Sequence, residues 1–242
     1  MDVLLLALAV AAALYGVMYL VCVRATWCKS KRTLHGKTVI VTGGNAGIGK
    51  TTAVDLARRG ARVILACRNK QRAEAAVCDI IKESGSNQVV YMQLDLASLQ
   101  SVRSFAETFL KQESRLDILI NNAALHIHGR TEDGFGMIFG VNHIVEINMS
   151  PSIKTVRAIR TELARSSLPI IKILNRPIIF LFFKDPVAGA QTTLHCALQE
   201  GIEPLSGCYF DNCTVMDLKA NARDDATAKK LWEISERFCG LA

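Results

Sequence analysis

The residues whose chemistry is easiest to interpret lie in a glycine-rich loop. Four glycines, at positions 43, 44, 47 and 49, follow a short β-branched run at residues 37–42 and precede a helical pattern at residues 50–59. Because glycine has no Cβ, its backbone can approach a pyrophosphate closely and adopt the φ values of a tight turn. A helix that begins after such a loop points free backbone N–H groups at an anion. The loop therefore predicts a phosphate-binding site, and its predicted cofactor-binding residues are Gly43, Asn45, Gly47, Ile48 and Gly49.

Two phosphate-binding patterns fit this loop. Residues 44–51 match G-x-x-x-x-G-K-T, the P-loop pattern of NTPases. A run at residues 89–95 that ends in an acid matches the strand that holds Mg²⁺ in that class. Residues 42–49 also match T-G-x-x-x-G-x-G, a loop of dinucleotide-binding proteins. The loop by itself leaves both classes open.

The segments around the loop predict the elements that hold it in place. Runs at residues 62–67, 89–94 and 116–120 alternate with helical patterns, which indicates an α/β fold with a Rossmann-like, doubly wound parallel sheet. In such a fold an acid at the end of the second strand selects NAD, whereas a base accommodates the 2′-phosphate of NADP. Here that strand runs into Arg68 with no acid nearby. Arg68 therefore predicts NADP (NADPH) as the cofactor.

Several sequences in the first 144 residues resemble those of short-chain dehydrogenases/reductases, in particular the retinol-dehydrogenase-like branch. They are the glycine loop, ACR, LDLASLQSVRSFA, LDILINNAA and FGVNHI, in order and at family spacing from residue 36 to residue 144. One departure is Ala124, where the family usually has glycine, and its methyl group is expected to crowd the cofactor slightly. The P-loop pattern explains none of these sequences and becomes a remote alternative.

The resemblance implies roles for five further residues. Asp95 and Leu96 would line the adenine pocket, and Asn122 and Ala123 would cover the cofactor. Asn142 would belong to the catalytic tetrad. The family activity is NADP-dependent oxidoreduction of apolar alcohols or carbonyls, retinoid-like or steroid-like.

The family pattern breaks after residue 144. Family members continue with a strand that ends in the catalytic Ser and a helix that bears Tyr-x-x-x-Lys, but none of the four tyrosines here has Lys four residues later. The resemblance resumes only at residues 158–163. In the family, Tyr donates the proton that carbonyl reduction requires, and Lys lowers the phenol pKa from its usual ~10. We therefore expect a shortened, catalytically impaired form with a sheet that is incomplete in its second half; the alternative is a non-catalytic membrane-bound form that binds cofactor or a partner.

Residues 3–23 contain no charged side chain. At 1.5 Å per residue a helix of this length spans roughly the 30 Å hydrocarbon core of a bilayer. The segment before it carries no positive charge and no small-residue cleavage site precedes Arg24, which disfavours a cleaved signal peptide and hence secretion, the alternative. Lys and Arg residues follow the run, so we expect an N-terminal transmembrane anchor helix in the endoplasmic reticulum membrane, with the domain facing the cytosol.

The charge distribution and the cysteine spacing argue against nucleic-acid binding and against metal sites. Between Arg24 and Arg72 there are twelve Lys or Arg residues and one acid, a balance suited to a membrane surface or to phosphate groups. No zinc-finger spacing or aromatic-rich basic repeat accompanies it, so nucleic acid is not an expected partner. The eight cysteines form no C-x-x-C pair and are interpreted as reduced thiols. His126 and His128 have no acid or Cys ligand beside them, so no metal site is predicted. An oligomer has no support in the sequence.

The chain divides into four expected parts. They are a membrane anchor (3–23), a basic linker (24–36), an NADP-binding Rossmann half (37–149) and a remnant of the substrate-side half (150–242). Within the remnant, residues 169–183 predict an interfacial helix over an apolar substrate pocket, with a plain buried helix left open. Residues 185–199 and 224–238 predict helices, and residues 206–215 resemble the last strand of the family sheet.

Overall fold

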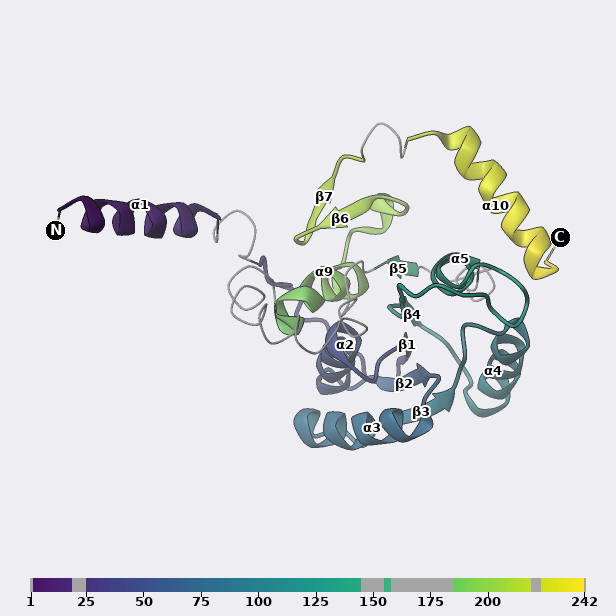
Figure 1. Cartoon of the computed structure of the whole chain (residues 1–242). Coiled ribbons are helices and arrows are strands. Elements are labelled where there is room, and N and C mark those ends of the chain that lie inside the picture. Colours follow the sequence, from purple (N-terminus) through teal and green to yellow (C-terminus); the bar gives the residue numbers. More distant parts are fainter. Residues whose placement is uncertain (1, 19–24, 145–154, 158–184, 219–222, 242) are drawn as a thin grey trace.

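A computed structural model describes residues 2–18, 25–144, 155–157, 185–218 and 223–241. A parallel sheet lies at its centre (Figure 1). Its strands are β1 (Thr38–Thr42), β2 (Arg62–Cys67), β3 (Val89–Gln93), β4 (Ile118–Asn121) and β5 (Thr155–Arg157), in the order β3-β2-β1-β4-β5. The chain moves outward from β1 to β3 and then returns to the other side of β1. This order confirms the predicted Rossmann-like α/β fold.

Helices cover both faces of the sheet. One face carries α2 (Gly47–Arg58), α3 (Lys70–Ser84) and α9 (Pro186–Leu198), and the other carries α4 (Leu99–Gln112). The last helix, α10 (Asp225–Cys239), reaches this second face only near its C-terminal end, where Cys239 is buried. Strands β1 and β2 are buried along almost their whole length, as expected of parallel strands covered on both sides. Four of these helices begin at a side-chain cap that accepts a backbone N–H; the capping residues are Asn69, Ser98, Asp185 and Asp224.

The expected last strand at residues 206–215 is not part of the main sheet. After the 3₁₀ turn η4 (Glu203–Leu205), strands β6 (Tyr209–Asp211) and β7 (Thr214–Met216) form a separate antiparallel hairpin. Its two turn residues, Asn212 and Cys213, both have positive φ (49° and 62°). Such a turn matches the twist of two-residue hairpins, so it folds the segment back on itself instead of extending it along the sheet.

β4 has a short neighbour at the side where the family sheet would continue. β5 pairs with it in parallel over three residues, with Leu119 opposite Thr155 and Asn121 opposite Arg157. A sheet that is incomplete in its second half would leave β4 with either an open edge or a makeshift partner, and the structure has the second. The resumed resemblance at residues 158–163 and the predicted interfacial helix at residues 169–183 lie outside the described residues.

The N-terminal helix α1 (Asp2–Met18) projects away from the sheet and its covering helices (Figure 1). Its large aliphatic side chains that are described, including Leu6 and Leu14, are more than half exposed. Within the described ranges no helix has both the length and the apolar character needed to cross a bilayer. The predicted run at residues 3–23 extends beyond α1 into residues 19–24, which are not described. The transmembrane anchor therefore stays a prediction.

The described part of the expected linker, residues 25–36, packs against the domain. Leu34 is 1% exposed and belongs to the core beneath α2 and α9. Its N–H donates to Arg59 O at 2.8 Å, and Ser30 Oγ donates to Leu198 O at 2.8 Å. This segment thus connects the start of the chain to both α2 and α9.

Asp117 ties the start of β4 to the start of β1. Its carboxylate accepts hydrogen bonds from the Thr38 N–H and Lys37 Nζ, both at 3.0 Å, and from Arg115 Nε at 2.7 Å. Burial acts to raise the pKa of Asp117, but the bonds from Arg115, Thr38 and Lys37 outweigh it and lower that pKa to about 2. The ionised carboxylate is therefore the form that holds the two strands in register.

Asp117→Asn should lower the free energy of unfolding by about 1–3 kcal/mol at neutral pH, because it removes charge-assisted bonds. Since the folded-state pKa lies below the unfolded value, this stabilisation is complete above about pH 4 and is lost as pH falls toward 2. Urea unfolding of both proteins across that range measures the effect. Asp79→Asn, in an exposed pair with Lys50, is the matched control and should change little. A difference between wild type and Asp117→Asn that does not shrink in acid would contradict this role.

Candidate nucleotide-binding site

A cavity of about 360 Å³ lies at the carboxyl ends of β1 to β4. It is open where the sheet order reverses, between β1 and β4, which is where Rossmann-like folds bind their ligands. Eight of the eleven predicted site residues line it, namely Gly43, Asn45, Gly47, Arg68, Asp95, Leu96, Asn122 and Ala123. The other three, Ile48, Gly49 and Asn142, lie behind the cavity wall and act through their neighbours.

The glycine loop forms one wall of the cavity. Gly43 has φ +63°, and a Cβ there would come within 3.0 Å of Ala123. α2 begins after Ala46, and no side chain of the described residues caps it. Its first-turn N–H groups therefore remain available for an anion at the positive end of the helix dipole.

Gly49 and Ile48 sit one layer behind the loop. A Cβ at Gly49 would lie 2.4 Å from Asn122 Nδ2 and 2.8 Å from Gly43 O. Ile48 packs against α9, where its side chain would lie 2.9 Å from a Cβ placed at Gly189. The two residues set how closely α2 approaches β4 and α9, and so determine where the loop lies.

A hydrogen-bond network joins the end of β4 to the end of β1. Thr42 Oγ1 accepts the N–H groups of Asn122 and Ala123, both at 3.0 Å. Asn122 Nδ2 donates to Thr42 O at 2.9 Å, while Asn122 Oδ1 is buried and has no hydrogen-bond partner among the described residues. A buried acceptor without a partner is costly. It fits a ligand that brings an N–H or O–H donor to this end of the cavity.

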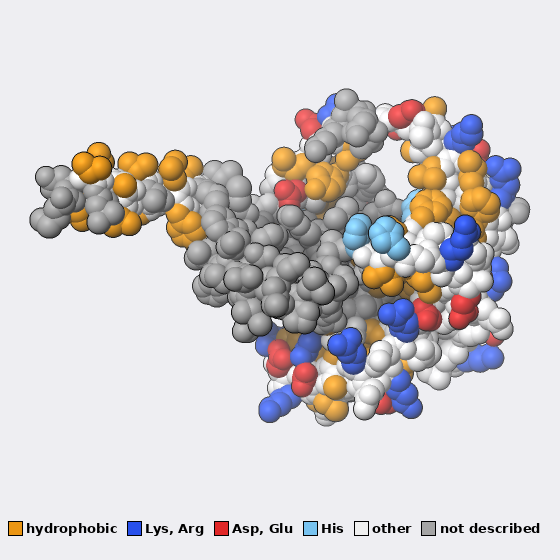
Figure 2. All heavy atoms as spheres, viewed as in Figure 1, with side chains coloured by type: hydrophobic (Ala, Val, Ile, Leu, Met, Phe, Trp, Pro, Cys, Tyr) orange, Lys and Arg blue, Asp and Glu red, His pale blue; other side chains and the backbone are white. Residues whose placement is uncertain are grey.

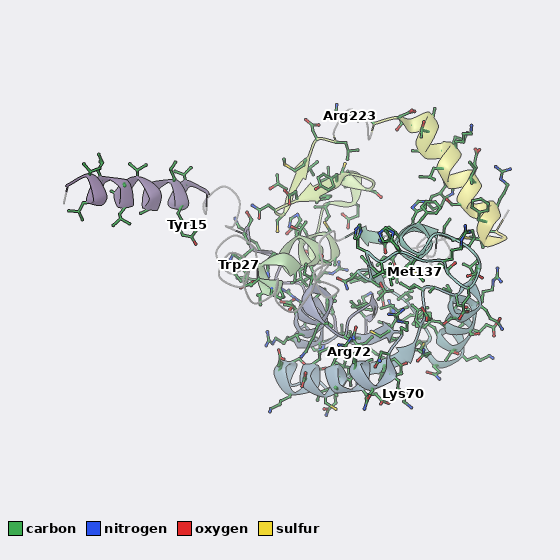
Figure 3. All side chains as sticks on the ribbon, viewed as in Figure 1. Tyr15, Trp27, Lys70, Arg72, Met137 and Arg223 are labelled. Carbon is green, nitrogen blue, oxygen red and sulfur yellow. The ribbon has the colours of Figure 1, made fainter. Side chains whose placement is uncertain are left out.

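The opposite wall is basic. Arg68 follows β2, and Arg72, labelled in Figure 3, projects from the first turn of α3; both line the cavity. Neither guanidinium forms an ion pair in the part of the chain that the structure describes. No sequence motif indicated Arg72, yet its position four residues after Arg68, in the first turn of a helix, was a usable signal. Two permanently charged groups at one wall favour a bound phosphate.

Cys67 lies between the basic wall and the glycine loop. Its thiol donates to Asn45 Oδ1, with an S···O distance of 3.6 Å. Burial raises the pKa of Cys67 to about 11, against smaller opposing effects of the Asn45, Gly44 and Gly43 backbone. The thiol therefore stays neutral at physiological pH and orients Asn45 rather than acting as a nucleophile.

Asp95 and Leu96 form the turn after β3 at the edge of the cavity. Asp95 Oδ1 accepts the Ala97 N–H at 2.9 Å, and the Asp95 N–H donates to Ser101 Oγ at 2.9 Å. These bonds hold the turn open at the point where the resemblance implies an adenine pocket. Both residues line the cavity beside Arg68.

Asn142 lies on a single π-helical turn, η2 (Gly140–Ile144), which follows the short helix α5 (Met137–Phe139). Its Oδ1 accepts the Leu125 N–H at 3.0 Å, and its Nδ2 donates to Leu125 O at 2.9 Å. Both ends of the amide are thus bound to one backbone residue. Asn142 fixes the loop after β4, whose residues Ala124 to Ile127 line the cavity, while its neighbour Val141 reaches the cavity itself.

His126 belongs to the same loop and lines the cavity. In the described ranges no group of three or more His, Cys, Asp or Glu side chains is arranged to hold a metal ion. The groups that the cavity can offer to a ligand include backbone amides, two guanidiniums and one amide oxygen, Asn122 Oδ1, that has no partner among the described residues. This donor set suits a phosphorylated organic ligand.

The sequence matches one protein-family model and several known proteins. A family model described as short chain dehydrogenase matches residues 37–174, more than half of the chain. The chain is 39% identical to dehydrogenase/reductase SDR family member 13 of Bos taurus, with 100% of this chain and 83% of that protein covered. It is 33% identical to retinol dehydrogenase 12 of Mus musculus, with 88% and 90% covered.

The alignment with the Bos taurus protein is longer than the chain. It runs over 313 positions, whereas the chain has 242 residues, so 71 positions lie opposite gaps in this chain. Among solved structures, an uncharacterized protein from Mycobacterium Paratuberculosis superposes with a TM-score of 0.64 at 24% identity, covering 90% of this chain and 98% of that one. That likeness shows the fold alone. Taken with the sequence relatives and the matched family model, it establishes that the chain belongs to the short chain dehydrogenase family.

Proposed function

We propose that the chain binds NADP(H) in the cavity at the end of the sheet and lacks the catalytic residues that would let the bound cofactor react. Members of the family use nicotinamide cofactors. The single observation that carries the choice of NADP(H) is the pair of guanidiniums, Arg68 and Arg72, at one wall of the cavity. The 2′-phosphate is what distinguishes NADP from NAD, and two permanent cations suit it.

The other walls fit the remaining parts of the cofactor. The uncapped start of α2 suits the pyrophosphate, and the turn at Asp95 and Leu96 suits the adenine. The buried Asn122 Oδ1 suits a donor on the nicotinamide side, beside Ala123. We propose Asn142 as a positioning residue, since both ends of its amide are hydrogen-bonded to the Leu125 backbone.

The proposed loss of catalysis rests on the sequence. NADPH supplies a hydride, and reduction of a carbonyl also requires a proton donor at its oxygen. None of the four tyrosines is followed by Lys at the fourth position. The 71 alignment positions without a counterpart in this chain support the proposal that part of the family sequence is missing. The relatives' names point to retinol as a family substrate; this chain would be a silent, cofactor-binding form.

We also propose that residues 3–23 anchor the chain in a membrane, with the domain on the cytosolic side. The exposed large side chains of α1, from Val3 to Val17, are apolar, and hydrophobic side chains lie along the part of α1 that Figure 2 shows. A helix that is hydrophobic all round is stable only when it is buried in protein or lipid. Within the described residues α1 projects into solvent, so lipid is the environment that suits it.

Fluorescence titration of the detergent-solubilised full-length chain with NADPH and with NADH tests the cofactor proposal. Because charge-assisted bonds contribute about 1.5–3 kcal/mol each, NADPH should bind at least about ten-fold more tightly than NADH. Equal affinities would refute the role of the two arginines. Absence of binding to either cofactor would refute the nucleotide site as a whole.

A further inference from the structure

A basic strip follows the apolar run at the start of the chain. We use this name for Trp27, Lys29, Lys31 and Arg32, all of which are exposed, with Trp27 at 58%. No acidic residue occurs between Asp2 and Asp55. None of the three cations forms an ion pair with any residue in the described ranges. The strip therefore presents three uncompensated positive charges beside one large aromatic side chain.

The strip is fixed to the domain by the residues that alternate with it. The Thr26 N–H donates to Asn212 Oδ1 at 2.8 Å, the Cys28 N–H donates to Gln191 Oε1 at 3.0 Å, and Ser30 Oγ donates to Leu198 O at 2.8 Å. Cys28 and Ser30 are partly buried, whereas Trp27, Lys29, Lys31 and Arg32 are exposed. The backbone of the strip is therefore bonded to the domain while its aromatic and cationic side chains remain exposed.

Arg59, which directly follows the last residue of α2, holds the strip with two further hydrogen bonds. Its guanidinium donates to Ser30 O at 2.9 Å and to Arg32 O at 3.1 Å. A surface whose backbone is already held loses little conformational entropy when it binds a partner. The strip is therefore a preorganised cationic surface rather than a loose tether.

The covalent chain limits how far the strip can lie from the predicted anchor. Trp27 is four residues beyond Val23, the end of the uncharged run. At no more than about 3.6 Å per residue, it lies within roughly 14 Å of that end in any conformation. Figure 3 shows Trp27 on the side of the domain from which α1 emerges. A bilayer that holds the anchor must therefore present its headgroups close to the strip.

We propose that the basic strip binds anionic lipid headgroups and so fixes the orientation of the domain against the membrane surface. Tryptophan favours the boundary between hydrocarbon and water, and each Lys or Arg near an anionic surface strengthens binding by about 1 kcal/mol, a factor of about five. Three such charges favour the docked orientation by a factor on the order of 100. The inference rests on the proposed anchor and adds to it a lipid preference that the anchor itself would not have.

The test uses the full-length chain carrying W232F, so that Trp27 is the only tryptophan. The protein is reconstituted into phosphatidylcholine vesicles with and without phosphatidylserine, both containing a headgroup spin-labelled lipid that quenches nearby tryptophan. Quenching of Trp27 should be stronger with phosphatidylserine and should weaken in high salt, which shortens the Debye length from about 8 Å. The substitutions K29Q, K31Q and R32Q together should remove the difference between the vesicles.

A matched control removes three exposed cations elsewhere. K111Q, K229Q and K230Q lie on α4 and α10 and lower the net charge equally, yet should leave the quenching unchanged. Equal quenching in both vesicles, or the same loss in both triple variants, would overturn the inference while leaving the anchor in place. A chain that fails to float with either vesicle would overturn the anchor, and the lipid preference with it.

Discussion

Gly49→Ala is expected to weaken NADPH binding on the order of 100-fold. Gly49 lies inside α2, where alanine normally stabilises a helix by about 1 kcal/mol relative to glycine. Here a Cβ would lie 2.4 Å from Asn122 Nδ2 and 2.8 Å from Gly43 O. The Asn122 amide is held by its bonds to Thr42 O and Gly43 O at 2.9 Å and 3.4 Å, so it cannot move without displacing the loop.

The expected size follows from overpacking. Forcing a methyl group into a filled space costs about 1–3 kcal/mol, and the strain falls on the loop that cradles the phosphates. NADPH affinity should fall on the order of 100-fold, and the free energy of unfolding should fall by about 1–3 kcal/mol. Titration and thermal unfolding of the same preparation separate the two effects.

Gly136→Ala is the matched control for this substitution. No atom lies within 4 Å of a Cβ built there, and its φ is negative. It should bind NADPH as the wild type does. If Gly49→Ala also bound NADPH normally, then α2 would not need its close approach to Asn122, and the proposed geometry of the loop would be wrong.

The double substitution of Arg68 and Arg72 by alanine is expected to convert the chain from an NADPH binder to one that no longer distinguishes NADPH from NADH. Each guanidinium would lose a charge-assisted bond to the 2′-phosphate, worth about 1.5–3 kcal/mol. NADPH affinity should therefore fall by about 100-fold or more, while NADH affinity should stay nearly unchanged. Neither arginine supports the fold through an ion pair with another described residue, so stability should change little.

The control for the arginine pair is Lys111→Ala with Lys229→Ala, which removes two positive charges from α4 and α10. It tests whether lost affinity comes from net charge rather than from the cavity wall. Parallel losses of NADPH and NADH affinity in the arginine variant would mean that the two side chains hold the loop rather than the 2′-phosphate.

Local motifs in the sequence predicted the first half of the fold and eight of the residues that line the cavity. The glycine loop, the three following strands and the residues at their ends follow one another along the chain, and parallel strands bring their carboxyl ends to one edge. Arg72 was missed because it is a helical residue outside any quoted motif. Its position near Arg68 depends on where Asn69 caps α3.

Features that depend on tertiary packing could not be predicted in this way. The hairpin of β6 and β7 depends on two residues with positive φ, Asn212 and Cys213, neither of which is glycine. The π-helical turn that carries Asn142 has no periodicity of its own in sequence. The two hydrogen bonds between the Asn142 amide and the Leu125 backbone are visible only in three dimensions.

A nucleotide site preserved without a catalytic centre should bind NADPH but not use it to reduce a carbonyl. The full-length chain, shown by titration to be saturated with NADPH, is incubated with all-trans-retinal, and retinol formation is followed against a sample without protein. We predict no retinol above that background, because no Tyr-Lys pair at the required spacing is present to supply the proton. NADPH-dependent retinol formation by the saturated chain would contradict the account, since another group would then be donating the proton.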